Sequence, residues 1–401
     1  MNILIVSQYF YPENFRINEI SRDLKNRGHN VTVLTGTPNY PAGKFYKGYG
    51  FFQRSRTEYY EGVKIIRCRI YPRKNGSKIN LSLNYLSFAL SASLKILNLG
   101  KERFDSILVF AVSPITVVLP AIVFKKLKST PIITWVQDLW PESVVAASGL
   151  KNKFVLSMIT KLVIFIYNNS NKILVSSEGM IDSIIDKGID KSKILYLPQW
   201  AEDIFENKKI KKNSSVILPK GFKIVFAGNI GHAQDIPSIL KAAKELKIYH
   251  DIHFIFIGSG SMFLWLSEQI IENCLSNNVH LLGSFPLDYM PYFYNEADAL
   301  LVSLGDNPIW SVTVPGKIQS YLCSGKPILT MINGEASNII NKSNAGLIAS
   351  SGDYIQLSKN ILKLKLFNEN ARLKIGQNGK NFYNNNFRKD LLMKKLEQLL
   401  S

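Results

Sequence analysis

Two glycines directly follow an apolar, β-branched run at the start of the second half of the chain. Residues 223–234 read Lys-Ile-Val-Phe-Ala-Gly-Asn-Ile-Gly-His-Ala-Gln, with the glycines at Gly228 and Gly231, and a helical pattern follows over 236–246. A strand, a glycine-bearing turn and a helix in this order direct backbone N–H groups toward a phosphate. The alternative is a purely structural turn, because any parallel strand that feeds a helix favours a glycine.

A second feature of the same kind lies further along this half. Pro315 and Gly316 stand where a helix is expected to begin, and Lys317 falls in its first turn. Cations are normally placed at the carboxyl end of a helix, so a lysine at this end favours a nearby anion. Two phosphate-directed helix starts predict a nucleoside diphosphate ligand. The alternative for Lys317 is a solvated first-turn side chain.

The elements that must position these residues alternate between strand and helix patterns, which predicts βα units and parallel sheets. The strand-like runs of the first half are residues 3–7, 31–35, 63–70, 106–110, 132–136, 173–175 and 194–197. Those of the second half are residues 223–227, 253–257, 279–282, 299–304, 327–331 and 346–349. The polar, lysine-rich stretch 207–215 between the halves has the composition of a linker.

Length, charge and cysteine content limit the class of protein. A chain of 401 residues is long enough for two domains. Its three scattered cysteines indicate reduced thiols rather than a metal site or disulfides. The first residues show neither a basic segment nor a cleavage site for secretion, so we expect a cytoplasmic protein. The net charge of +19 suits an anionic partner, yet no nucleic-acid-binding module is recognisable.

The helical stretch 81–97 is unusually apolar. Its polar residues form one narrow stripe at helical spacing, namely Asn84, Ser87, Ser91 and Lys95. Basic residues precede the stretch, and others follow the apolar stretch 115–124; they are Arg67, Arg69, Arg73, Lys74, Lys78, Lys125, Lys126 and Lys128. A basic rim beside an apolar helix suits an anionic membrane surface. The alternatives are a core helix and charge that merely keeps the protein in solution.

Several motifs, in order along the chain, resemble those of family 4 glycosyltransferases, which have the GT-B fold. They are Tyr11-Pro-Glu13, residues 24–33, Gln137-Asp-Leu-Trp-Pro-Glu142, Gly258-Ser-Gly260, Gly283-Ser-Phe-Pro286 and Cys323-Ser-Gly-Lys-Pro-Ile328. The resemblance implies an α/β, GT-B architecture of two Rossmann-like domains with parallel sheets facing a cleft. Within the family, the chain looks most like the N-acetyl-L-fucosamine transferases of bacterial O-antigen and capsule biosynthesis.

The chain departs from the family pattern at charged positions. Ser320 and Val312 stand where most members have two glutamates, and Asn229 and Gln234 stand where many have Arg and Lys. The usual glycine pair of the first-domain loop is replaced within residues 14–16, which include Arg16. The remaining positive groups, Lys317 and Arg16, are therefore expected to compensate more of the negative charge that develops on the leaving diphosphate.

Site residues follow from these motifs. The donor-binding set is Arg16, Gly228, Asn229, Gly231, Gln234, Gly258, Ser259, Gly260, Phe285, Pro315, Gly316 and Lys317. Phe285 is a candidate stacking surface for the nucleobase or, alternatively, a core residue. No carboxylate pair has metal-ligand spacing, so we expect no metal and no cofactor.

Asp138 and Glu142 are the candidates for accepting the proton of the attacking hydroxyl or for orienting the acceptor. They follow the strand-like run 132–136, and the carboxyl ends of parallel strands face the ligand. Asp138 has an alternative role as a helix cap, because Pro141 and Glu142 resemble a first turn. Together with Lys317, these two carboxylates form the predicted catalytic set.

The combined interpretation is a metal-independent hexosyltransferase that is peripheral on the inner face of the plasma membrane. It is expected to move a sugar, N-acetyl-L-fucosamine by resemblance, from a UDP-sugar to an undecaprenyl-diphosphate-linked saccharide. We expect an acceptor-binding domain over residues 1–205, a linker over 206–221 and a nucleotide-sugar-binding domain over 222–380. A helix over 381–401 is expected to pack toward the first domain. The alternatives are a GT-B UDP-sugar epimerase and a non-catalytic basic protein that binds membranes.

Overall fold

The computed structural model describes residues 1–51, 57–206, 211 and 216–401. Contacts divide the chain into an N-terminal unit, Met1–Leu197 with Met393–Ser401, and a C-terminal unit, Pro198–Leu392. This division falls shortly before the boundary expected at residue 205. The expected linker lies partly outside the described residues.

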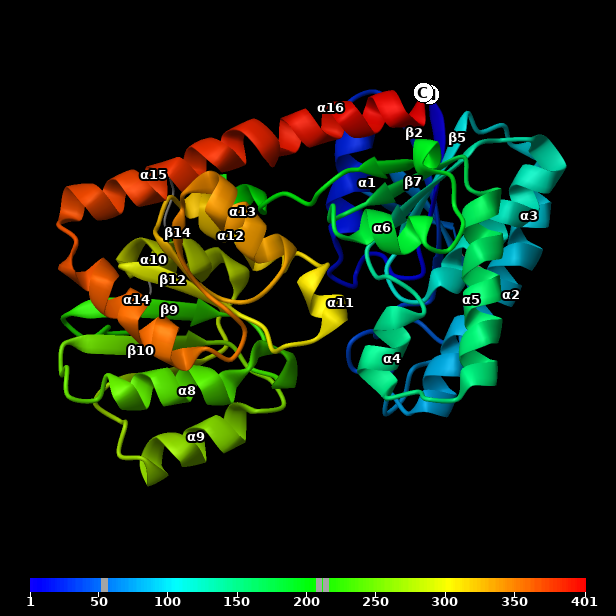
Figure 1. The fold of residues 1–401 in the computed structure, drawn as a ribbon. Coiled ribbons are helices and arrows are strands. Elements are labelled where there is room, and N and C mark those ends of the chain that lie inside the picture. Colours follow the sequence, from blue (N-terminus) through cyan, green and yellow to red (C-terminus); the bar gives the residue numbers. More distant parts are fainter. Residues whose placement is uncertain (52–56, 207–210, 212–215) are drawn as a thin grey trace. The chain divides into compact units, whose positions relative to one another are not determined.

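The N-terminal unit is built on an eight-stranded sheet in the order β3-β4-β2-β1-β5-β6-β7-β8 (Figure 1). Its strands are β1 (Asn2–Val6), β2 (Asn30–Gly36), β3 (Thr57–Tyr60), β4 (Val63–Cys68), β5 (Ser106–Ala111), β6 (Ile132–Val136), β7 (Lys172–Val175) and β8 (Ile194–Tyr196). All neighbours pair in parallel except β3, which runs antiparallel to β4 at the edge of the sheet. The order reverses at β1, so the crevice at the carboxyl ends of β1 and β5 is a natural place for a ligand.

The C-terminal unit is built on a six-stranded, wholly parallel sheet in the order β11-β10-β9-β12-β13-β14. Its strands are β9 (Phe222–Ala227), β10 (Ile252–Ile257), β11 (Val279–Gly283), β12 (Ala299–Ser303), β13 (Ile328–Met331) and β14 (Gly346–Ala349). The order reverses between β9 and β12, which places the second ligand crevice where the glycine-bearing turn lies.

Helices cover both faces of each sheet (Figure 1). Those of the N-terminal unit are α1 (Arg16–Asn26), α2 (Lys78–Asn98), α3 (Leu119–Lys128), α4 (Glu142–Ser148), α5 (Lys153–Asn169) and α6 (Met180–Ile185). Those of the C-terminal unit are α7 (Asp203–Glu206), α8 (Ile236–Glu245), α9 (Phe263–Glu272), α10 (Met290–Glu296), α11 (Pro308–Ser311), α12 (Lys317–Ser324), α13 (Glu335–Ser343), α14 (Tyr354–Leu366) and α15 (Glu369–Asn386). The last helix, α16 (Lys389–Leu400), ends in residues that belong to the N-terminal unit. There Glu397 accepts hydrogen bonds from Arg27 and contacts His29.

The strand predictions are confirmed, and the fold is the predicted pair of parallel, Rossmann-like α/β sheets. Strand β3 is not among the predicted strands. In this strand Thr57 and Tyr59 are exposed and the alternate residues are half-buried, so it lacks the continuous apolar run of a buried parallel strand.

Helix α2 packs its polar stripe toward the protein, together with the buried apolar side chains Phe88, Ala89, Ala92 and Ile96. Asn84 is fully buried; its amide oxygen accepts a hydrogen bond from Gln8 Nε2 at 2.8 Å, and its amide nitrogen donates to the Tyr71 carbonyl. Ser87 Oγ accepts from the backbone N–H of Tyr71 at 2.8 Å, and Ser91 Oγ donates to the Arg69 carbonyl. These bonds satisfy backbone groups that follow β4, so the polar stripe has a structural partner.

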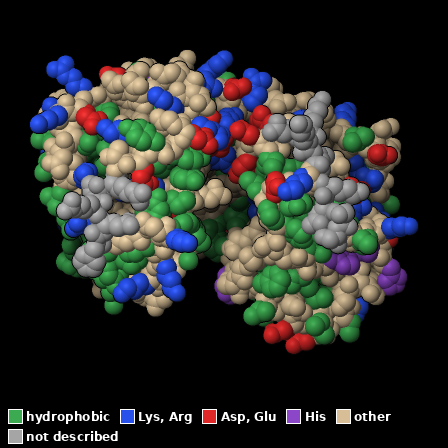
Figure 2. Space-filling view, turned by 180° about the vertical axis from the view of Figure 1, so that it is seen from behind, with side chains coloured by type: hydrophobic (Ala, Val, Ile, Leu, Met, Phe, Trp, Pro, Cys, Tyr) green, Lys and Arg blue, Asp and Glu red, His purple; other side chains and the backbone are tan. Residues whose placement is uncertain are grey.

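The opposite side of α2 exposes a continuous apolar row, here called the leucine row. Its members are between 44% and 74% exposed, and they are Ile79, Leu83, Leu86, Leu90, Leu94 and Leu97. Hydrophobic side chains and Lys or Arg side chains lie close together on the N-terminal unit, on the left in Figure 2. No helix among the described residues is long and apolar enough to cross a membrane. A contiguous exposed row of this kind marks an interaction surface.

The orientation of α2 predicts stability effects of different size for substitutions on its two sides. Asn84→Leu should destabilise the protein by about 2 kcal/mol or more, because each buried polar group that loses its partner costs about 1–3 kcal/mol. Leu90→Ser on the leucine row should change the free energy of unfolding by only about 0.5 kcal/mol. Urea denaturation of both variants measures the difference. A larger loss in Leu90→Ser than in Asn84→Leu would contradict the orientation.

Candidate functional site

The C-terminal unit contains a pocket of about 520 Å³ at the carboxyl ends of its central strands. Seven of the predicted donor-binding residues line it: Gly228, Asn229, Gly258, Ser259, Phe285, Gly316 and Lys317. They come from the turns after β9, β10 and β11 and from the start of α12. Its volume lies within the range of about 300–1,000 Å³ that is usual for small-molecule sites.

Glycine is required on two of these turns. Gly228 and Gly258 have φ values of +128° and +143°, a region that other residues rarely adopt. A Cβ atom on Gly258 would lie 1.9 Å from the Gly228 carbonyl oxygen, so the two turns approach each other closely because neither residue has a side chain. A Cβ atom on Gly228 would lie 3.3 Å from Lys317 Nζ, which places the ammonium group beside this turn.

Lys317 begins helix α12, with Gly316 at the N-cap, as the sequence predicts. Its Nζ is buried and has no hydrogen-bond partner in the described part of the chain. It lies 3.9 Å from the centroid of the Phe226 ring. Burial lowers the pKa of Lys317 to about 7. A buried ammonium without a partner is costly, so this geometry favours binding of an anion in the pocket.

Four other predicted donor residues do not line the pocket but shape its turns. Asn229 Nδ2 donates to Gln234 Oε1 at 3.1 Å, and a Cβ atom on Gly231 would lie 2.6 Å from that same Nδ2. A Cβ atom on Gly260 would lie 2.3 Å from the Ile230 carbonyl oxygen. Pro315 accepts the hydrogen bond of the Ile318 N–H at 2.9 Å and so helps to start α12.

Several residues outside the predicted donor-binding set also line the pocket, among them Glu202, Phe205, Ser284, Met290 and Tyr294. Phe205 of α7 stacks on Tyr294 of α10 at 5.1 Å between ring centroids. The sequence predicts residues 202–205 to be part of the first domain, whereas the structure places them in the C-terminal unit, because their pattern carries no sign that they pack on the second sheet. Ser284 directly precedes the predicted Phe285. Its place in the motif Gly283-Ser-Phe-Pro286 is the sequence signal that could have identified it as a lining residue.

In the N-terminal unit, Asp138 follows β6 and is tied to the loop after β5. Its Oδ2 accepts hydrogen bonds from the backbone N–H of Ser113 at 3.0 Å and from Ser113 Oγ at 2.9 Å. Trp140 Nε1 also donates to Ser113 Oγ, at 3.1 Å. Helix α4 has Pro141 at its N-cap position and no side-chain cap bond, so Asp138 does not cap it. The carboxylate instead lies at the carboxyl edge of the sheet, where a substrate hydroxyl can bind.

Glu142 and Arg16 are engaged in local ion pairs. Glu142 Oε1 accepts hydrogen bonds from Lys187 Nζ and from Ser183 Oγ, which connects α4 to the region of α6. Arg16, the first residue of α1, pairs with Glu19 at 3.3 Å. The first contact supports a structural role for Glu142. Arg16 belongs to the N-terminal unit and does not line the pocket around Lys317.

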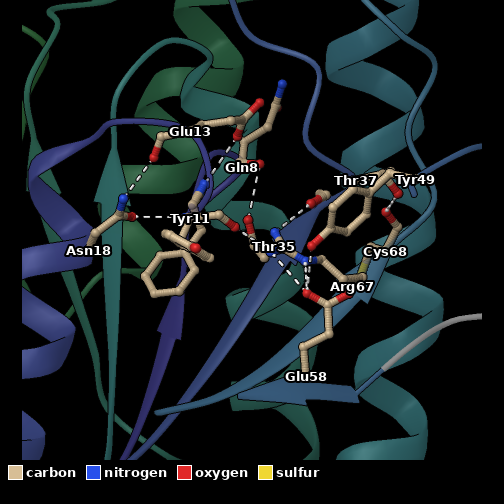
Figure 3. Close-up of polar contacts among 12 residues, drawn as sticks. Gln8, Tyr11, Glu13, Asn18, Thr35, Thr37, Tyr49, Glu58, Arg67 and Cys68 are labelled. Atoms are coloured by element: carbon tan, nitrogen blue, oxygen red, sulfur yellow. Dashed lines mark hydrogen bonds and ion pairs between the residues drawn. The ribbon is translucent and has the colours of Figure 1, made fainter. Parts of the chain in front are cut away.

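The loop that follows β1 is held by a buried carboxylate (Figure 3). Glu13 Oε1 accepts from the backbone N–H groups of Asn39 and Tyr40, both at 2.7 Å, and Oε2 accepts from that of Phe10 at 3.2 Å. Burial raises the pKa of Glu13 to about 7, although these donors oppose the shift. Glu13 therefore joins the loops after β1 and β2 at the ligand crevice of this sheet.

Arg67 has a related role in the same view and does not belong to the basic surface rim expected from the sequence. It is only 4% exposed, pairs with Glu58, and donates hydrogen bonds to the Tyr11 and Gly36 carbonyls. Its charge thus fixes the carboxyl ends of the strands rather than facing solvent.

The described residues contain no group of three or more His, Cys, Asp or Glu side chains arranged to hold a metal ion. The cysteines Cys68, Cys274 and Cys323 are free thiols.

Comparison with known families assigns both units. Residues 14–200 match the glycosyl transferase 4-like domain, and residues 207–382 match glycosyl transferases group 1. The putative colanic acid biosynthesis glycosyl transferase WcaI of Escherichia coli is 23% identical over 343 residues, which cover 81% of this chain and 82% of WcaI.

Two solved structures show the same fold at low sequence identity. A glycosyltransferase from Rickettsia africae superposes with a TM-score of 0.73 at 15% identity, covering 100% of this chain and 97% of its own. Anabaena HepE, solved in complex with UDP, superposes with a TM-score of 0.69 at 12% identity, covering 100% of this chain and 99% of its own. The N-terminal unit therefore carries a glycosyl transferase 4-like domain and the C-terminal unit a glycosyl transferases group 1 domain, which identifies the chain as a glycosyltransferase of the GT-B fold.

Proposed function

We propose that this protein transfers a sugar from a UDP-sugar to a polyprenyl-diphosphate-linked saccharide during assembly of a bacterial surface polysaccharide. The observation that carries the proposal is the buried, unpartnered Lys317 ammonium in the pocket of the C-terminal unit. Support for the donor comes from HepE, which was solved with UDP, and support for the pathway comes from the name of WcaI. The preferred pair is UDP-N-acetyl-L-fucosamine and undecaprenyl-diphosphate-linked N-acetylglucosamine.

The chemistry requires a group that stabilises the leaving diphosphate. Departure of UDP develops negative charge, and preorganised positive groups in a poorly hydrated pocket stabilise that charge. Lys317 supplies a full charge, and the N-terminus of α12 adds a partial one. Asn229 is neutral, so it can donate a hydrogen bond to a phosphate oxygen without compensating charge.

The proposed proton acceptor for the attacking hydroxyl is Asp138. Its position at the carboxyl edge of the sheet and its hydrogen bonds from Ser113 hold the carboxylate in one orientation. A fixed acceptor within reach of the hydroxyl is what general base catalysis needs. Glu142 is a weaker candidate because Lys187 already neutralises it.

The leucine row of α2 is the proposed contact with the cytoplasmic face of the membrane. Its apolar side chains lie beside basic residues, and each Lys or Arg near anionic lipid contributes about 1 kcal/mol. A polyprenyl-linked acceptor resides in the bilayer, so an enzyme that uses it benefits from such a surface.

The lowered pKa of Lys317 predicts a pH-dependent affinity for UDP. The free protein has a largely neutral Lys317 above pH 7, whereas the bound diphosphate favours the ammonium form and raises its pKa. Binding should therefore take up a proton above pH 7, and affinity should fall by up to about tenfold per pH unit until the pKa of the complex is reached. Calorimetric titration at pH 6.5–8.5 in two buffers of different ionisation enthalpy measures both quantities.

The control for this titration is Lys317→Met, which keeps the apolar stem. It should bind UDP more weakly by about 1.5–3 kcal/mol, the range for a hydrogen bond to a charged group, and should lose the proton uptake. An unchanged UDP affinity together with a lower melting temperature would show that Lys317 is only structural.

Transfer itself is tested with purified protein, a panel of UDP-sugars and undecaprenyl-diphosphate-linked N-acetylglucosamine. UDP release should depend on the acceptor and should persist in excess EDTA, because Lys317 supplies the positive charge. Loss of activity in EDTA that returns with Mg²⁺ or Mn²⁺ would refute this assignment of charge. Acceptor-independent UDP release with an epimerised free sugar would indicate an epimerase instead.

Membrane contact by the leucine row predicts that the protein sediments with anionic vesicles and is released by salt. Leu86→Ser/Leu90→Ser should reduce sedimentation. The matched control is Leu264→Ser/Ile271→Ser on α9, whose side chains are 74% and 70% exposed on the other unit. Equal loss in both double variants would exclude α2 as the specific contact.

A further inference from the structure

The N-terminal unit contains a second cavity, of about 380 Å³, enclosed by α2, α4, α5 and the loops that carry Ser113 and Trp140. Its walls are mainly apolar, and the side chains that form them include Leu81, Tyr85, Trp140, Val144, Val155 and Ile159. Neither the family matches nor the proposed transfer of a sugar assigns an occupant to this cavity.

The cavity adjoins the proposed proton acceptor. Ser113 lines it, and the same hydroxyl donates to Asp138 Oδ2 at 2.9 Å. Trp140 also lines the cavity, donates to Ser113 Oγ, and packs against Tyr85 with 6.4 Å between ring centroids. An apolar occupant would therefore lie next to the group that is proposed to receive the hydroxyl proton.

The charge at the rim suits a phosphate. Lys78 lines the cavity from the first turn of α2, a turn without an acidic residue, and donates a hydrogen bond to the Ser148 carbonyl at 2.9 Å. A cation at this end of a helix is opposed by the helix dipole, and a bound anion would relieve that repulsion. Arg73 and Lys74, which precede this helix, do not line the cavity; they contact the rings of Tyr9, Tyr40 and Tyr71, so Lys78 supplies the charge at the rim.

The cavity also lies close to the exposed leucine row along α2. Ser82 lines the cavity, and Leu86, one turn further on, belongs to the row and is 54% exposed. An extended hydrocarbon chain that leaves the cavity along α2 would thus stay on apolar surface.

We propose that this cavity holds the first isoprenoid units of the acceptor lipid, with its phosphate at Lys78 and its saccharide toward Ser113 and Asp138. The inference rests on the proposed function and specifies where the lipid of the acceptor binds. The juxtaposition of an apolar cavity, a basic rim and a fixed carboxylate favours a prenyl phosphate that bears a reacting sugar. A fatty acyl chain from a bilayer lipid bears no reacting sugar, so the position of Asp138 beside the cavity does not favour it as the occupant.

The first experiment compares soluble acceptors in which N-acetylglucosamine diphosphate carries a methyl, a geranyl or a farnesyl group. Wild-type kcat/KM should rise at least tenfold from the methyl to the farnesyl acceptor. Ile159→Trp, which fills the cavity, should lower the farnesyl-to-methyl ratio of kcat/KM at least tenfold. The control Phe165→Trp, also on α5 but outside the cavity and 44% exposed, should keep the wild-type ratio.

A second experiment uses the wild-type protein, so that it does not depend on the folding of a variant. A photoreactive farnesyl monophosphate should label peptides of α4 and α5, and unlabelled farnesyl monophosphate should compete. Lys78→Gln should weaken binding of farnesyl monophosphate at least fivefold but leave binding of farnesol within twofold of the wild type.

The outcomes separate this inference from the proposed function. Transfer to all three acceptors with equal kcat/KM would overturn the prenyl site and leave glycosyl transfer intact. No transfer to any acceptor would count against the proposed function, and the labelling would then decide the cavity alone. Labelling outside α4 and α5 would overturn the prenyl site. It would also be overturned if phosphatidylglycerol vesicles competed with the label as effectively as farnesyl monophosphate does.

Discussion

The ammonium group of Lys317 lies buried without a hydrogen-bond partner, and much of the C-terminal unit is arranged to hold it there. Gly228 leaves room for it, the Phe226 ring faces it, and the parallel crossover between β12 and β13 places the start of α12 beside β9. Such a charge is unfavourable until an anion arrives, which is why burial lowers its pKa to about 7. Binding of the proposed diphosphate beside this ammonium would recover that free energy.

In the N-terminal unit, buried polar side chains hold the loops at the carboxyl ends of the strands in place. Glu13 accepts hydrogen bonds from backbone N–H groups, and Arg67 donates hydrogen bonds to backbone carbonyls; these backbone groups would otherwise lack partners. Asn84 contributes in the same way from α2, because its amide nitrogen donates a hydrogen bond to the Tyr71 carbonyl. The polar stripe of α2 is buried beside apolar side chains of the same helix, and the leucine row lies on the opposite, exposed side. The hydrogen bonds that hold these loops and the exposure of the leucine row therefore depend on the same orientation of α2.

The two units also differ in how they treat charge. The C-terminal pocket contains a buried lysine without a hydrogen-bond partner among the described residues, whereas the N-terminal unit pairs Arg67 with Glu58 and Lys187 with Glu142. A leaving diphosphate requires concentrated positive charge, and an acceptor hydroxyl requires a carboxylate that is not already bound in an ion pair. Asp138 meets the second requirement better than Glu142, because its hydrogen bonds come from the neutral Ser113.

The sequence by itself determined the two parallel α/β units and the positions of their buried strands. It also placed the glycine turn at Gly228 and the start of α12 at Lys317. These features are local: a β-branched apolar run, a glycine that adopts a positive φ, and a proline and glycine before a helix each limit the backbone within a few residues. The edge strand β3 was missed because its half-exposed residues carry no such signal.

Only the tertiary structure decided which groups meet across long sequence separations. The stripe of Asn84, Ser87 and Ser91 was visible in the sequence, but its inward direction depends on partners near Gln8 and Tyr71. In the sequence, Glu142 and Asp138 are equivalent candidates for the proton acceptor; the structure distinguishes them because Lys187 forms an ion pair with Glu142. Phe205 joined the pocket of the C-terminal unit because Tyr294 offers it a stacking surface. Periodicity reports which side of a helix differs from the other, whereas the direction that each side faces is set by contacts that sequence spacing does not record.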